Sequence, residues 1–286
     1  MKHILASLSG MPGDHAVLRT AALVAKAHDA HIDALFVYAG LQSIREMTGL
    51  KAVGDPLAAI SGEFSREEAE RRHHAHAVFD EMSLRLGLPI ADAPRPDLTG
   101  PSIARVDVDS LALAEVARRA RFYDLTVMAR EPTMLPSRVT DVVMASGRPL
   151  LLAPQGPRQE LGTNIAIAWK PCAESARAVS MAAPFLARTS RVTLIVMPEG
   201  GASQSDTIAA ARPLRECLEW RGIQAQILAV DPGPEPGLAL REAVYAQECD
   251  LLVMGAYGHS RMREAVLGGV TQAVLEECEI PVLMAH

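Results

Sequence analysis

Short runs of apolar residues alternate along the whole chain with longer segments in which apolar residues recur at helical spacing. The short runs are rich in β-branched side chains and are typical of buried strands, whereas the segments between them have the 3.6-residue period of helices. Strands and helices that alternate in this way predict right-handed β-α-β crossovers and parallel sheets flanked by helices. The pattern therefore predicts an α/β protein.

The pattern occurs twice. Residues 2–38 and 163–198 each contain an apolar strand, a polar turn, an alanine-rich helix and a second strand. Residues 123–154 and 249–286 each contain a strand, a loop, a helix and a final apolar strand that follows a proline. The repeat predicts two open, twisted parallel sheets of one type in tandem, and the first residues of the chain are expected to form a strand.

The boundary between the repeats is expected near residues 154–162, where two prolines and two glycines interrupt the periodicity. We accordingly expect one domain over residues 1–155 and a second over residues 161–286. Each repeat ends in an apolar strand, 149–154 or 281–286, which would form the exposed edge of a sheet. Because an apolar edge needs covering, these last strands are expected to pair with each other.

The two repeats differ at two places. The first has about thirty more residues between its second and fourth strands, mostly in residues 41–87, which predict a longer helix with an irregular lead-in. It also has five residues fewer in the last loop, where residues 129–138 contain two prolines and no glycine. Since proline has no backbone N–H to offer a ligand, we expect the first repeat to have lost any anion site there.

Composition and charge exclude several classes of function. The net charge is −6 and no long basic run is present, which argues against a nucleic-acid partner. No stretch reaches the roughly 18 apolar residues of a membrane helix. We therefore expect no membrane partner and a location in the cytoplasm. The four cysteines are widely spaced, which favours reduced thiols over a metal site.

The most informative motif lies in the second repeat. Gly255 ends an apolar strand, Gly258 follows after two residues, and Gly268 and Gly269 come directly before the next helix. With the strand before it and the proline-led strand after it, this motif resembles the universal stress protein family. The resemblance extends over both repeats, so the chain resembles a tandem member of that family.

The resemblance implies a five-stranded parallel sheet in each domain, of the Rossmann-like type also found in adenine nucleotide alpha hydrolases, with domains paired through their last strands. It also implies an ATP site, with Mg²⁺, in domains that keep the glycine motif. By the family pattern the triphosphate would lie among Gly255, Gly258, His259, Ser260, Gly268, Gly269, Val270 and Thr271. Adenine and ribose would lie against Ala168, Trp169, Lys170 and Met197.

Physical chemistry supports an anion site at this place. Gly255 lies at the carboxyl end of a predicted parallel strand, the edge at which open α/β sheets bind ligands. Glycines there let backbone N–H groups face a phosphate without an intervening Cβ. Gly268 and Gly269 precede a helix whose free N–H groups and positive dipole end attract an anion.

Two departures from the family pattern keep other functions open. The family usually has Ser or Thr where this chain has Gly269, and an acidic residue where it has Lys170, which would contact a phosphate or extend into solvent. These differences favour an alternative hypothesis, an interaction or scaffold protein that binds no nucleotide, with another protein or a second copy as partner. A slow ATP hydrolase ranks last, because no general base and no phosphate-binding loop of the Gly-Lys-Ser/Thr kind are present.

The remaining candidates each have a plainer explanation. Trp169 would stack on a base or cover the end of the sheet. His259 and Ser260 are adjacent, a spacing that rarely suits a catalytic pair. Glu264 would hold Mg²⁺ or form a surface ion pair. The histidines at 73, 74 and 76 are interpreted as a solvated helix face, not a metal site.

Overall fold

The structure, a computed structural model, describes residues 1–38, 55–93, 99–110, 114–130, 136–256 and 269–286, without the side chains of 55–64, 136 and 137. By its internal contacts the chain divides into two compact units. The first comprises Met1–Ala129 and Leu135–Val142, and the second comprises Arg130–Met134 and Val143–His286. Each unit is described below by itself.

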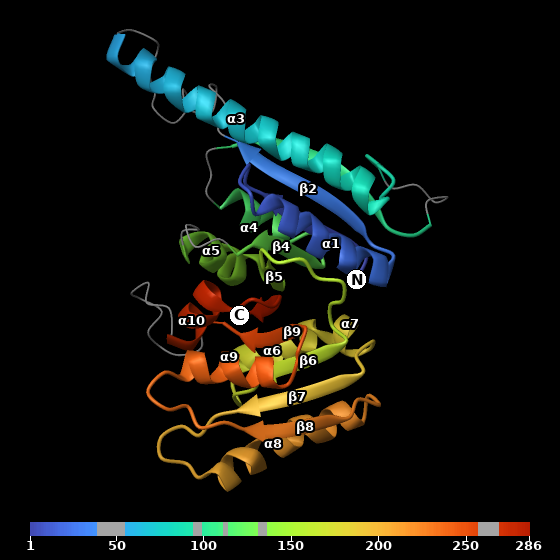
Figure 1. Ribbon diagram of the computed structural model, residues 1–286, viewed down its shortest axis with the longest axis vertical. Helices are drawn as coiled ribbons and strands as arrows, with labels where there is room; N and C mark the ends of the chain where they lie inside the picture. The colour runs from blue at the N-terminus through green and yellow to red at the C-terminus, as the bar shows by residue number, and fades with distance from the viewer. Residues whose placement is uncertain (39–54, 94–98, 111–113, 131–135, 257–268) are drawn as a thin grey trace. The chain divides into compact units, whose positions relative to one another are not determined.

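The first unit is a parallel sheet with helices (Figure 1). Its elements are β1 (His3–Leu8), α1 (Asp14–His28), β2 (His31–Tyr38), α3 (Asp55–Leu86), β3 (Ser102–Asp109), α4 (Glu115–Ala120) and β4 (Leu125–Ala129). Helix α5 (Pro136–Ser146) begins in this unit and ends in the second. The strand order is β3-β2-β1-β4, and every pair is parallel.

The second unit repeats this plan and extends it. Its elements are β5 (Leu150–Ala153), β6 (Asn164–Ala168), α6 (Ala173–Met181), α7 (Ala183–Leu186), β7 (Arg191–Val196), α8 (Gln204–Glu219), β8 (Ala225–Ala229), α9 (Pro236–Ala246), β9 (Leu251–Gly255), α10 (Gly269–Glu277) and β10 (Val282–Ala285). Strands β8-β7-β6-β9-β10 form a parallel sheet in that order. Strand β5 pairs with β10 antiparallel.

These observations confirm the predicted α/β fold, its first strand and the pairing of the last strands of the two repeats. The contacts assign β5 to the second unit, although its sequence ends the first repeat. The domain limits 1–155 and 161–286 stay a prediction.

The cores lie on both faces of the sheets. Strands β4, β5 and β10 are buried at every residue, as expected for strands whose two faces are covered. Helix α1 faces its sheet with alanine and valine side chains, which let the helix approach closely. In the second unit α8 lies against β7 and β8 (Figure 1).

The longer helix predicted within residues 41–87 is α3, which is 32 residues long and packs against α1 and β2 (Figure 1). The interpretation of its histidines as a solvated face holds for His73, which is exposed, and not for His76. His76 is half-buried, and its Nε2 lies 2.8 Å from the Asp107 carboxylate on β3. Among the helices described, none combines the length and the apolar character needed to cross a membrane.

Candidate functional site

The topology of the second unit creates a crevice at the carboxyl end of β6. The chain leaves β6 towards β7 on one side and returns later as β9 on the other side. Open α/β sheets bind ligands at such a reversal of strand order, outside the carboxyl ends of the strands. The ends of β6 and β9 are Ala168 and Gly255, two of the predicted site residues.

A cavity of about 570 Å³ lies at this place, within the range of about 300–1,000 Å³ typical of small-molecule sites. The predicted residues that line it are Ala168, Trp169, Lys170, Met197, Gly255, Gly269, Val270 and Thr271. The other four, Gly258, His259, Ser260 and Gly268, lie outside the described residues, as does Glu264. The structure therefore brings together, around one cavity, residues that are up to about a hundred positions apart in sequence.

The start of α10 forms one wall of the cavity. Gly269 is the first residue of this helix, and Val270 and Thr271 follow it in the first turn, which contains no acidic residue. A Cβ added to Gly269 would meet no atom of the described residues within 4 Å. The positive dipole end of the helix thus borders the cavity without a carboxylate in the first turn to neutralise it.

The start of α6 also borders the cavity, but its charge is already balanced. Glu174 lies in its first turn. The backbone N–H of Glu174 and the Cys172 thiol hold the pKa of the Glu174 carboxyl below its ordinary value. An anionic ligand is therefore expected at α10 and not at α6.

The structure shows a packing reason for glycine at position 255. A Cβ at this position would lie 2.6 Å from the backbone nitrogen of Ser175 and 2.7 Å from the carbonyl carbon of Glu174. The first turn of α6 therefore packs directly on the end of β9. Close helix packing by itself explains this glycine, whereas packing against the described residues does not explain Gly269.

Polar side chains that the sequence did not single out line the mouth of the cavity. The Lys170 Nζ lies 2.8 Å and 2.6 Å from the two carboxylate oxygens of Glu199, so its charge is paired rather than extended into solvent. Asp206 and Thr207 come from the first turn of α8, whose N-cap Ser203 accepts a hydrogen bond from the Asp206 N–H at 3.2 Å. The helix-capping pattern at Ser203 was the one available sequence signal.

Apolar side chains form the rest of the lining. They include Ile195, Val196, Ala210, Leu240 and Met254, together with Met197. Trp169 donates its backbone N–H to the Ile195 carbonyl at 2.9 Å, which holds it at the end of β6. Its indole N–H is buried and has no hydrogen-bond partner within the described part of the chain. An apolar wall with one free donor suits a flat heterocycle that carries a hydrogen-bond acceptor.

The corresponding place in the first unit is filled by the chain itself. At the carboxyl end of β1, the Arg71 guanidinium donates to the Ser9 carbonyl from Nε at 3.0 Å and from Nη2 at 2.6 Å. Gly10 has a φ of 74°, and a Cβ there would lie 2.5 Å from the Arg71 carbonyl oxygen. The buried Asp14 accepts the Ser9 and Gly10 N–H groups at 2.8 Å and 2.9 Å. Helix α3 thus covers the end of β1.

Comparison with known proteins gives a family match for the second repeat. A family model described as the universal stress protein family matches residues 163–286. A universal stress protein of Synechocystis is 59% identical over 34 residues, a stretch that is 12% of this chain and 12% of that protein. The chain therefore matches only a small part of that relative's length.

Solved structures match the full chain. A universal stress protein of Archaeoglobus fulgidus has a TM-score of 0.69 at 16% identity, and the match covers 99% of this chain and 97% of that one. A protein of Pseudomonas aeruginosa assigned to the same family has a TM-score of 0.56 at 16% identity, covering 100% of this chain and 93% of that one. At these identities the structural matches show the fold of both repeats.

Proposed function

We propose that this chain, which belongs to the universal stress protein family through residues 163–286, binds one adenine nucleotide in its second repeat and acts as a nucleotide-dependent interaction protein in the cytoplasm. The observation that carries the proposal is the 570 Å³ cavity at the carboxyl ends of β6, β7 and β9, with the start of α10, whose first turn has no acidic residue, in its wall.

The apolar part of the lining and the start of α10 would each contact a different part of the nucleotide. The base and ribose would lie against Ala168, Trp169, Lys170 and Met197, where the wall is apolar and the Trp169 indole N–H is free to donate. The phosphates would lie at Gly269, Val270 and Thr271, where backbone N–H groups and the helix dipole favour negative charge. Gly258, His259, Ser260 and Gly268 complete the proposed phosphate site by the family pattern.

The charge of the lining points to a divalent cation with the nucleotide. The lining contains the carboxylates of Glu174, Glu199 and Asp206 and one lysine, whose charge Glu199 pairs. A bare triphosphate would be repelled by this surplus of negative charge, and Mg²⁺ bound to the phosphates would offset that repulsion. We therefore expect removal of Mg²⁺ with a chelator to weaken ATP binding at least tenfold, measured by calorimetry with and without the chelator. Equal affinity under both conditions would contradict the role of the cation.

The direct test is calorimetric titration of ATP and Mg²⁺ into chain that has been unfolded and refolded to remove carried ligand. We expect one site per chain with micromolar affinity or tighter, because Arg71 and α3 fill the equivalent place in the first unit. Two sites would contradict the single-site proposal. No heat at two well-separated temperatures would favour the alternative function, an interaction protein that binds no nucleotide.

A serine at position 269 should improve the site. The space around Gly269 admits a side chain, and its hydroxyl would supply the phosphate contact that the family pattern has at this position. One added hydrogen bond contributes about 0.5–1.5 kcal/mol, so Gly269→Ser is expected to bind ATP about three to ten times more tightly. Gly269→Ala is the matched control, because it adds the Cβ without the hydroxyl. Equal affinities in the serine and alanine variants would place the phosphate elsewhere.

A further inference from the structure

A cluster of titratable side chains lies in the first unit at the amino-terminal edge of its sheet. His3 and His31 are the first residues of β1 and β2 and are register partners in the parallel pair. Asp33 follows His31 by two residues, so its side chain lies on the same face of the strand. Ligands of open α/β sheets bind at the opposite, carboxyl-terminal edge, so the family topology does not explain this cluster.

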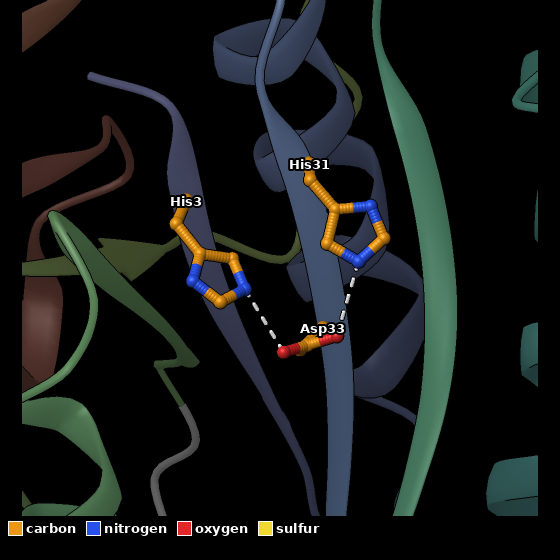
Figure 2. Close-up of side chains that lie close together, drawn as sticks. All are labelled: His3, His31 and Asp33. Carbon is orange, nitrogen blue, oxygen red and sulfur yellow. Dashed lines mark hydrogen bonds and ion pairs between the residues drawn. The ribbon is translucent and has the colours of Figure 1, made fainter. Parts of the chain in front are cut away.

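Both imidazoles point at one carboxylate (Figure 2). The Nε2 of His3 lies 3.0 Å from one oxygen of Asp33, and the Nε2 of His31 lies 3.1 Å from the other. The ligand atoms of the three residues all lie within 4.8 Å of one another. They form the one such group of three or more His, Cys, Asp or Glu side chains that the described part of the chain contains.

Neighbouring side chains form hydrogen bonds and ring contacts with all three residues of this cluster. The Nδ1 of His31 lies 2.8 Å from the hydroxyl of Ser102, the first residue of β3, and the Tyr123 hydroxyl donates to Asp33 at 2.6 Å. The His3 ring lies against the Tyr123 ring, with centroids 4.2 Å apart. Hydrogen bonds of this kind fix the tautomer and the orientation of metal-binding side chains, and their loss commonly weakens metal binding about 10- to 100-fold.

Asp33 is held in its ionised form. Burial by itself would raise the pKa of the Asp33 carboxyl, but hydrogen bonds from His3, His31 and Tyr123 outweigh burial and keep this pKa below its ordinary value. The side chain of Asp33 is 16% exposed, and those of His3 and His31 are 42% and 27% exposed. A cation can therefore reach the cluster from solvent.

We propose that His3, His31 and Asp33 form a binding site for Zn²⁺. Two imidazole nitrogens and one carboxylate oxygen are a common zinc ligand set, and a water molecule would complete the tetrahedron. The ligand atoms would draw together to the spacing of about 3.3 Å that zinc bonds of about 2.0–2.1 Å require. Mg²⁺ and Ca²⁺, which prefer oxygen ligands, do not fit this set.

The test uses Zn²⁺ and Co²⁺ as probes on the full chain. Co²⁺ should give the visible absorption of a tetrahedral nitrogen and oxygen site at one ion per chain, and Zn²⁺ should displace it. His3→Gln and His31→Gln are each expected to weaken Co²⁺ binding at least tenfold, and the double variant should lose the spectrum. Zn²⁺ should also raise the melting temperature of the parent chain and not that of the double variant, because a bound ligand stabilises the folded state.

His76→Gln is the matched control. It removes another half-buried imidazole that faces a carboxylate, Asp107, whose other ion-pair partner is Arg72. Within the described residues, this pair belongs to no group of three potential metal ligands. We expect this variant to bind Co²⁺ as the parent does. Unchanged binding in the His3/His31 double variant, no binding in the parent at millimolar Co²⁺, or the near-ultraviolet charge-transfer band of cysteine ligation would each overturn the proposal. Far-ultraviolet circular dichroism of the metal-free variants confirms that a loss of binding does not come from unfolding.

Discussion

Gly269→Asp is expected to weaken ATP binding about 30- to 100-fold while leaving the fold as stable as before or slightly more stable. The new carboxylate would lie at the start of α10, where the proposed phosphate contacts are made. Two unit charges 4 Å apart interact by about 4 kcal/mol at an effective dielectric constant of 20, and screening by Mg²⁺ and salt would leave about 2–2.7 kcal/mol. The same carboxylate favours the helix dipole by about 0.3–1 kcal/mol.

Calorimetry for binding and thermal melting without ligand measure the two effects separately. Gly269→Asn is the control, because it has nearly the same shape without the charge and should lose much less affinity. A loss of affinity that is equal in the aspartate and asparagine variants would indicate steric blocking rather than electrostatic repulsion. If the aspartate variant bound ATP with the affinity of the parent, the start of α10 would not be part of the ATP site.

Gly255→Val is expected to lower the free energy of unfolding by about 3 kcal/mol. Its Cβ would collide with the backbone of Ser175 and Glu174, which belong to the first turn of a helix and have no flexible end that can move aside. Overpacking of a close contact costs about 1–3 kcal/mol, and a β-branched residue is at the upper end of that range. The melting temperature should fall by about 6–12 °C.

Thermal melting of the ligand-free chain measures this effect. Gly269→Ala is the control for the loss of a glycine as such, because its Cβ meets open space, and we expect its free energy of unfolding to change by no more than about 0.5 kcal/mol. If Gly255→Val melted at the same temperature as the parent, the packing of α6 on β9 would not be the reason for this glycine.

Periodicity was sufficient to predict the fold, because alternation of apolar strands and helices restricts the topology before any contact is known. Ala168, Met197 and Gly255 could be placed at one edge of a sheet, since each ends or follows a parallel strand. The close packing of α6 on Gly255 could not be predicted from the sequence, because strand-exit glycines have the same appearance whether they admit a phosphate or a neighbouring helix.

Other features of the sites depend on register and on side-chain direction, which periodicity does not contain. Glu199 lies in a polar connection and Asp206 in the first turn of α8, both ordinary places for surface carboxylates, and only the structure brings them to the cavity. His3 and His31 are 28 positions apart and become neighbours through the parallel register of β1 and β2. The histidines grouped in sequence at 73, 74 and 76 do not form such a cluster: His73 is exposed, whereas His76 faces Asp107.

The antiparallel pairing of β5 with β10 determines which fragments of this chain can be stable by themselves. A fragment that begins at residue 161, where the repeat suggests a boundary, would lose the strand whose Leu150, Leu151 and Leu152 pair with β10. The backbone N–H and C=O groups on that side of β10 would then be unpaired along an apolar edge. Such an edge recruits any available strand, so the fragment would self-associate or aggregate. A fragment of the second repeat that is soluble and monomeric must include residues 150–153.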